Sequence, residues 1–179
     1  MNNFALWSKL GICAVALIVG NSPAGNLSKQ SPISAACSTP EYHQFDFWIG
    51  DWDAFEIEKP GKPQARVRVD RILESCVLRE DYQDVNGHKG QSFSIYDATK
   101  KMWHQTWVTN RGELLLLDGA FQKGEMVLLG QDLYRGNMRE IRGTWKPEAG
   151  RVRETAVRSL NGGKSWEPWF DLAFRPHNP

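Results

Sequence analysis

The chain has 179 residues, of which 41% are hydrophobic and 24% charged, values typical of one globular domain. Its 22 basic residues nearly balance its 21 acidic ones, and no basic block stands out, which argues against a nucleic-acid partner and against strong membrane association. Eight Trp and eight Phe are a large aromatic supply for so short a chain, enough to fill a core or to line a pocket.

Residues 1–24 predict a signal peptide, and therefore a secreted or periplasmic protein. Lys9 precedes a short apolar run, Leu10 to Val19, and small residues follow it up to Ala24, where cleavage is expected. Cleavage after Ala36 is a second possibility. A retained anchor is another, although the run is shorter than the roughly 20 apolar residues that a membrane span needs.

Removal of the signal peptide would take Cys13 with it and leave two cysteines, Cys37 and Cys76. An even pair in an oxidising compartment predicts one disulfide. The alternative is two separate buried thiols.

Residues 25–43, rich in Ser, Pro and Ala, predict a flexible leader ahead of a domain over 44–176. From Phe45 onward, short apolar and aromatic runs alternate with turn residues such as Asn86-Gly87 and Asn161-Gly162-Gly163. This spacing predicts an antiparallel meander of ten strands. They are expected near 46–58, 64–73, 76–84, 90–97, 101–109, 113–122, 125–133, 138–146, 151–160 and 166–175.

Ten short antiparallel strands must protect their edges, and closure into a barrel does so completely. The expected fold class is therefore all-β, a single up-and-down barrel of about ten strands preceded by a signal peptide. A β-sandwich is the structural alternative.

The stretch Phe45-Asp46-Phe47-Trp48-Ile49-Gly50-Asp51-Trp52 carries a resemblance that extends from about Cys37 to Arg175. The chain resembles a family of small secreted bacterial proteins of unknown function with this Phe-Asp-Phe-Trp-x-Gly-x-Trp motif. The resemblance implies a lipocalin-like (calycin) barrel and brings no established activity or cofactor. In lipocalins the Trp of Gly-x-Trp closes one end of the barrel under a basic residue of the last strand, which implies that Arg175 packs over Trp52.

Candidate ligand-binding residues follow from the alternation of side chains along strands. Trp103, Gln105 and Trp107 share one face of a strand, and we expect that face to point inward because two indoles would otherwise expose much apolar area. Glu80, Arg142 and Glu154 are expected to join them, with Glu80 and Arg142 paired to each other or to other partners, since an isolated buried charge is costly. Packing of the tryptophans in a filled core is the alternative.

The sequence contains no catalytic signature. The four histidines lack paired metal-ligand spacing, and neither His104 nor His177 lies in a haem-binding pattern, so neither a metal nor a cofactor is expected.

Three functions stay open. The favoured one is binding of a small apolar or amphipathic ligand inside the barrel. The others are an enzyme that uses a cavity Glu as acid or base, and a partner-binding envelope protein with a filled barrel. A Glu with a raised pKa would favour the enzyme, and an open cavity without one would favour the carrier. The oligomeric state stays unknown.

Overall fold

Ten antiparallel strands alternate with tight turns in the computed structural model, which describes residues 36–59 and 61–178. The expected signal peptide lies outside these residues. Every strand overlaps its predicted position. The strands are β1 (Gly50–Glu56), β2 (Ala65–Ile72), β3 (Val77–Asp84), β4 (Lys89–Asp97), β5 (Met102–Thr109), β6 (Leu114–Gln122), β7 (Glu125–Tyr134), β8 (Asn137–Glu148), β9 (Arg151–Ser159) and β10 (Glu167–Pro176).

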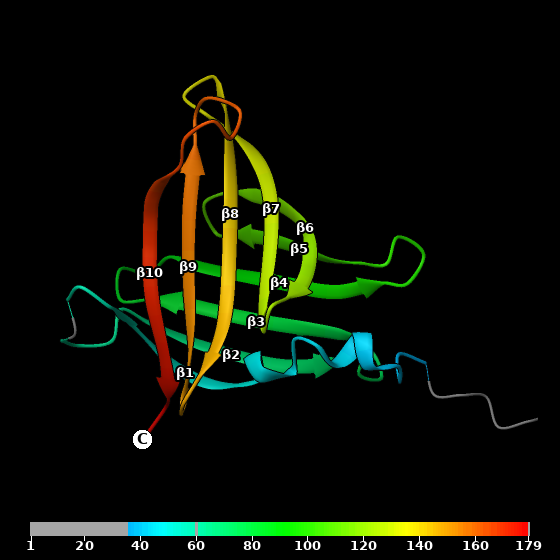
Figure 1. The fold of residues 1–179 in the computed structure, drawn as a ribbon. Coiled ribbons are helices and arrows are strands. Elements are labelled where there is room, and N and C mark those ends of the chain that lie inside the picture. Colours follow the sequence, from blue (N-terminus) through cyan, green and yellow to red (C-terminus); the bar gives the residue numbers. More distant parts are fainter. Residues whose placement is uncertain (1–35, 60, 179) are drawn as a thin grey trace, which may run out of the picture. The chain divides into compact units, whose positions relative to one another are not determined.

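The sheet closes on itself. Each strand pairs with its neighbours in sequence, and β1 pairs with both β2 and β10, so the order around the barrel is β1-β10-β9-β8-β7-β6-β5-β4-β3-β2. In Figure 1 the strands β8–β10 stand upright while β3 and β4 run across the view. The expected closed up-and-down barrel is confirmed. In the described part of the chain, no helix is both long and apolar enough to cross a membrane.

Side chains alternate between the interior and the outer face, as the period of two requires. In β2, Val67 and Val69 are buried while Arg68 between them is exposed. In β5, Trp103 and Gln105 are buried, so the face predicted to point inward does so. Because each pair of strands is in register, one choice of face in β2 sets the inward face of its neighbours.

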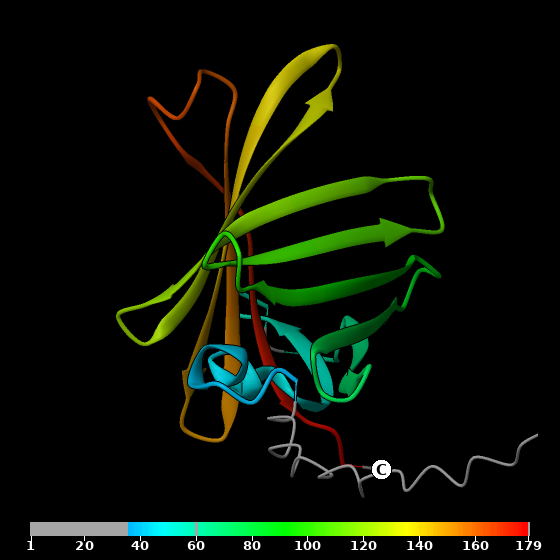
Figure 2. The same ribbon diagram turned by 90° about the vertical axis from the view of Figure 1, so that its right-hand side faces the viewer.

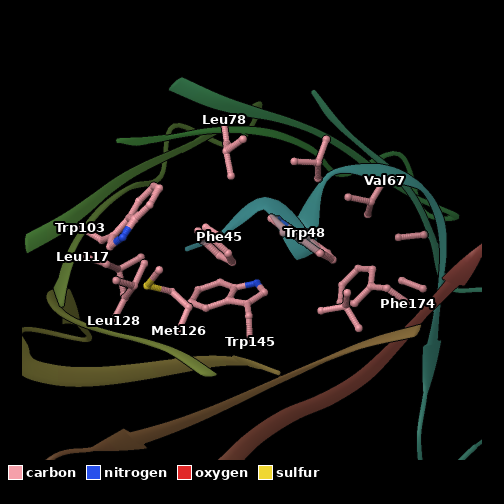
Figure 3. Close-up of a cluster of buried hydrophobic side chains, with 14 of the residues drawn as sticks. Phe45, Trp48, Val67, Leu78, Trp103, Leu117, Met126, Leu128, Trp145 and Phe174 are labelled. Atoms are coloured by element: carbon pink, nitrogen blue, oxygen red, sulfur yellow. The ribbon is translucent and has the colours of Figure 1, made fainter. Parts of the chain in front are cut away.

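The first predicted strand begins too early. Residues 46–48 belong instead to η2 (Asp46–Trp48), which together with η1 (Pro40–His43) makes a short 3-10 segment ahead of β1. Figure 2 shows this segment at the end of the barrel opposite the β7–β8 and β9–β10 hairpins. Phe45 and Trp48 are three residues apart, so they leave the segment on one side, and both are fully buried. In Figure 3 they lie at the centre of the core side chains, where they form the floor of the barrel.

The floor segment is tied to the barrel wall. A disulfide joins Cys37 to Cys76 in the β2–β3 turn, with their Cα atoms 5.2 Å apart, which confirms the predicted pairing. The Arg71 guanidinium donates to the carbonyl oxygen of Tyr42 at 3.1 Å and forms an ion pair with Asp46. Residues 36–43, the described part of the expected leader, are therefore held in place and are not a flexible tether.

The expected contact between Trp52 and Arg175 is wrong. Arg175 lies opposite Asp53 in the β1–β10 ladder, and its guanidinium packs over Phe55, 4.7 Å from the ring centroid. Trp52 belongs to the inward set, where it stacks on Trp48 with ring centroids 6.1 Å apart. Residues directly opposite each other in a ladder lie on the same face of the sheet, whereas consecutive residues of one strand lie on opposite faces. Arg175, paired with Asp53, therefore cannot reach the side chain of Trp52. The barrel end is closed by Trp48, which meets Phe174 edge-on at 4.5 Å.

Packing of the Trp52 indole explains why the Gly-x-Trp motif has glycine at position 50. The Trp52 indole leans back along its own strand, so that a Cβ on Gly50 would lie 2.5 Å from the ring. The same arrangement recurs in β8, where a Cβ on Gly143 would lie 2.9 Å from the Trp145 ring. Residues i and i+2 share a face of a strand, so glycine at i makes room for the indole of i+2.

Candidate functional site

A cavity of about 550 Å³ lies inside the barrel above the aromatic floor. Its upper residues come from the ends of five hairpins, β1–β2, β3–β4, β5–β6, β7–β8 and β9–β10, and those at the rim, such as Asn86, Arg111 and Glu113, are exposed to solvent. The cavity is therefore a cup that opens between these hairpins and is closed below by the floor segment.

Aromatic rings make up much of the cavity wall. The rings of Tyr82 on β3 and Trp107 on β5 pack edge to face, with ring centroids 5.7 Å apart. Trp145 lines the lower part, and Trp169 and Phe170 stand near the mouth. A largely apolar wall with a few polar groups is the usual composition of a small-molecule pocket.

A buried polar chain enters the cavity from β3 to β5. The Gln105 amide donates to Ser94 Oγ at 3.0 Å, and the Ser92 hydroxyl donates to Glu80 Oε2 at 2.8 Å. Glu80 is only 8% exposed. Burial raises the pKa of Glu80 from its ordinary 4.5 to about 7, the hydrogen bond from Ser92 lowers it in part, and the nearby charge of Asp81 adds to the rise.

Glu154 reaches the same cavity from β9. Enclosure by the barrel raises the pKa of Glu154 well above its ordinary value, and the charge of Glu80 raises it further. The indole N–H of Trp145, its neighbour across the β8–β9 ladder, lowers this pKa in part. Among the described residues, however, no acceptor meets hydrogen-bond geometry for that N–H. Two carboxyl groups thus share one cavity, and a charge on Glu80 disfavours ionisation of Glu154.

Arg139 stands at the mouth. It is buried to 9% exposure between β7 and β8, where its Nε donates to Asp132 Oδ1 at 2.9 Å and a second nitrogen binds the other oxygen of the same carboxylate. Its guanidinium also lies over the rings of Tyr134 and Trp169, at 4.7 and 4.8 Å. These contacts neutralise Arg139 locally and fix it as a part of the rim.

Arg142 does not join the cavity. It lies on the outer face of β8, exposed, with its guanidinium 4.8 Å from the centroid of Trp166. The expected pairing of Glu80 with Arg142 is therefore wrong. The inward set of β8 is Arg139, Ile141, Gly143 and Trp145, and the presence of Trp145 and Ile141 in that set was the available signal.

The remaining expected residues divide into two groups. Glu80, Gln105, Trp107 and Glu154 line the cavity. Trp103 points inward but belongs to the floor, where its N–H donates to Gln44 Oε1 at 3.1 Å and its ring meets Phe45 edge-on. Cavity residues that the sequence analysis did not select include Tyr82, Trp145 and Arg139.

Within residues 36–59 and 61–178, no three His, Cys, Asp or Glu side chains are grouped as metal ligands. The polar groups of the cavity are carboxyl, amide, hydroxyl, indole, guanidinium and imidazole groups, suited to hydrogen bonding, proton transfer and recognition of charge. Comparison of the sequence with protein-family models and with curated proteins found no match.

Proposed function

We propose that this protein binds a small amphipathic molecule inside the barrel, in a secreted or periplasmic setting. The observation that carries the proposal is the aromatic cup of about 550 Å³ with one mouth and a closed floor. A filled barrel would leave no such space, so the cavity favours a binding protein over a purely structural one. The disulfide is compatible with an oxidising compartment.

Titration with the neutral fluorescent probe N-phenyl-1-naphthylamine tests the proposal. Wild type is expected to bind it at micromolar concentration. Trp107→Ala is expected to weaken binding about tenfold because it removes a wall of the cup. Trp166→Ala is the matched control, since Trp166 packs on Arg142 at the outer face and should leave affinity unchanged.

A second variant keeps every tryptophan. A Cβ on Gly90 would lie 2.3 Å from the Trp107 ring, so Gly90→Ala must displace the indole. We expect Gly90→Ala to change probe affinity while thermal unfolding stays cooperative. Lack of probe binding by folded wild type would overturn the proposal, as would equal losses in the Trp107 and Trp166 variants.

An enzyme is a second candidate function, favoured by one observation. The pKa of Glu80, near 7 inside the cavity, is the value that suits a general acid or base at neutral pH. Native mass spectrometry of small molecules that co-purify with wild type and with Glu80→Gln separates the two functions. A carrier holds one unaltered molecule in wild type, and the variant holds the same molecule or less of it. An enzyme holds its substrate in the variant and a product, or nothing, in wild type.

A further inference from the structure

The charged groups of the cup are unevenly distributed. Six carboxyl groups line it: Glu56, Glu80, Asp84, Glu113, Asp132 and Glu154. Against them stand two arginines and one histidine, Arg111, Arg139 and His88, and Arg139 is already held by Asp132. The lining therefore carries an excess of acidic groups.

Two of these carboxyl groups, Glu80 and Glu154, have no cation as a partner in the described part of the chain. Glu80 accepts one hydrogen bond, from the neutral Ser92 hydroxyl, and among the described residues neither Glu80 nor Glu154 forms an ion pair with Lys or Arg. Buried carboxyl groups in proteins normally have such a partner. A buried carboxyl group without such a partner is held toward its neutral form, and a cation inside the cavity would favour its ionised form.

The indole N–H of Trp145 is a second polar group of the cavity without a partner among the described residues. Trp145 is 4% exposed and lines the cavity, and its indole N–H has no partner of hydrogen-bond geometry among the described residues. Trp145 lies directly opposite Glu154 in the β8–β9 ladder, so the two side chains lie on the same, inner face of the sheet. An N–H donor favours the ionised carboxylate. A ligand that ionises Glu154 would therefore also satisfy Trp145.

The aromatic walls of the cavity also suit a positively charged group. The faces of Tyr82, Trp107 and Trp145 carry the negative side of the aromatic quadrupole, which attracts ammonium groups. Their edges and the aliphatic side chains between them accept a hydrocarbon body.

We propose that the ligand of the cup is an organic amine with an apolar body, whose ammonium group binds between Glu80 and Glu154. This inference rests on the proposed binding function and names the chemical class of its ligand. The ammonium group replaces the missing cation, while the hydrocarbon part lies against Trp107 and toward the mouth.

Three probes with the same chain test the inference: decylamine, 1-decanol and decanoate, titrated calorimetrically at about pH 6.5, below the pKa of Glu80. Decylamine is expected to bind at least tenfold more tightly than decanol, and decanoate most weakly. Binding of decylamine should also release protons, because the ammonium draws Glu80 and Glu154 into their ionised forms. The release is measured by comparing buffers with different ionisation enthalpies, and decanol should cause none.

The variant Glu80→Gln/Glu154→Gln is expected to lose the preference for decylamine and its proton release while it keeps its affinity for decanol. Glu140→Gln, a glutamate on the outward set of β8, is the matched control and should behave as wild type. If decanol or decanoate binds as tightly as decylamine, or if the double variant keeps the preference, the amine inference is overturned and the binding function stands. If none of the three probes binds, the binding function itself fails.

Discussion

At the scale of single residues, Glu80 and Glu154 are two cavity carboxyl groups whose pKa values are raised by the fold. Their neighbours within the barrel supply a hydroxyl and an indole N–H but no paired cation among the described residues. Both carboxyl groups are therefore easier to protonate in the folded chain than in the unfolded chain. Such groups lower the free energy of unfolding once the pH is high enough to ionise them in the unfolded chain.

The pH dependence of stability should report this directly. Below about pH 4.5, Glu80 is protonated in both the folded and the unfolded state and imposes no penalty. Between pH 4.5 and 7 only the unfolded state ionises it, so stability falls as the pH rises. A pKa raised from 4.5 to about 7 corresponds to a loss of about 3 kcal/mol.

Glu80→Gln removes this titration, so its advantage over wild type in the free energy of unfolding should grow by about 3 kcal/mol between pH 4 and pH 8. Urea unfolding at several pH values measures the difference, with Glu140→Gln as the outer-face control. A constant difference between wild type and Glu80→Gln would contradict the raised pKa.

At the scale of elements, the close approach of β6 and β7 sets a limit on sequence. A Cβ on Gly119 would lie 2.0 Å from the carbonyl oxygen of Val127, which is a backbone atom of the neighbouring strand. The clash cannot be relieved by turning a side chain, in contrast to the contact between Gly90 and the ring of Trp107. Glycine at position 119 is required by strand packing and not by a turn.

Gly119→Ala is therefore expected to lower the free energy of unfolding by about 3 kcal/mol or more, because the ladder of β6 and β7 must separate locally. Gly61→Ala is the matched control. A Cβ there meets no atom within 4 Å, so its effect should stay within about 0.5 kcal/mol. Denaturant unfolding of the two variants decides between this account and one in which the strands shift freely, which predicts equal effects.

At the scale of the whole molecule, the floor segment is joined to the barrel by the backbone that continues into β1 and by one disulfide. The floor segment supplies Phe45 and Trp48 to the core, and the Cys37–Cys76 disulfide ties the chain before it to the β2–β3 turn. The cup has a closed lower end only while this segment stays in place.

Removal of the disulfide should lower the free energy of unfolding and loosen the floor segment. A closed loop with a sequence separation of 39 residues corresponds to about 4 kcal/mol in the chain-entropy treatment. Cys37→Ser/Cys76→Ser is expected to lose a large part of this in chemical unfolding. Hydrogen exchange of the Trp103 indole N–H, which is bonded to Gln44, should also become faster in the variant. An unchanged exchange rate would show that the Arg71 contacts hold the floor without the disulfide.

Much of this architecture is readable from the sequence, because strand positions depend on local patterns. Alternating runs and glycine turns placed all ten strands, and the expected loss of Cys13 with a predicted signal peptide left Cys37 and Cys76 as the predicted pair. Two indoles on one face were sufficient to orient β5, since exposure of both would cost too much. The same reasoning applied to Trp145 would have oriented β8 correctly and selected Arg139 in place of Arg142.

Only the tertiary structure decided the rest, because alternation tells which residues share a face but not which face is enclosed. The side of the ladder on which Arg175 lies follows from its pairing with Asp53 across the barrel closure, a contact between the two ends of the domain. That Phe45 and Trp48 form a floor, and not the start of a strand, depends on the space inside the closed barrel. The raised pKa values of Glu80 and Glu154 have the same origin, since removal from water is a property of the enclosure and not of the residues themselves.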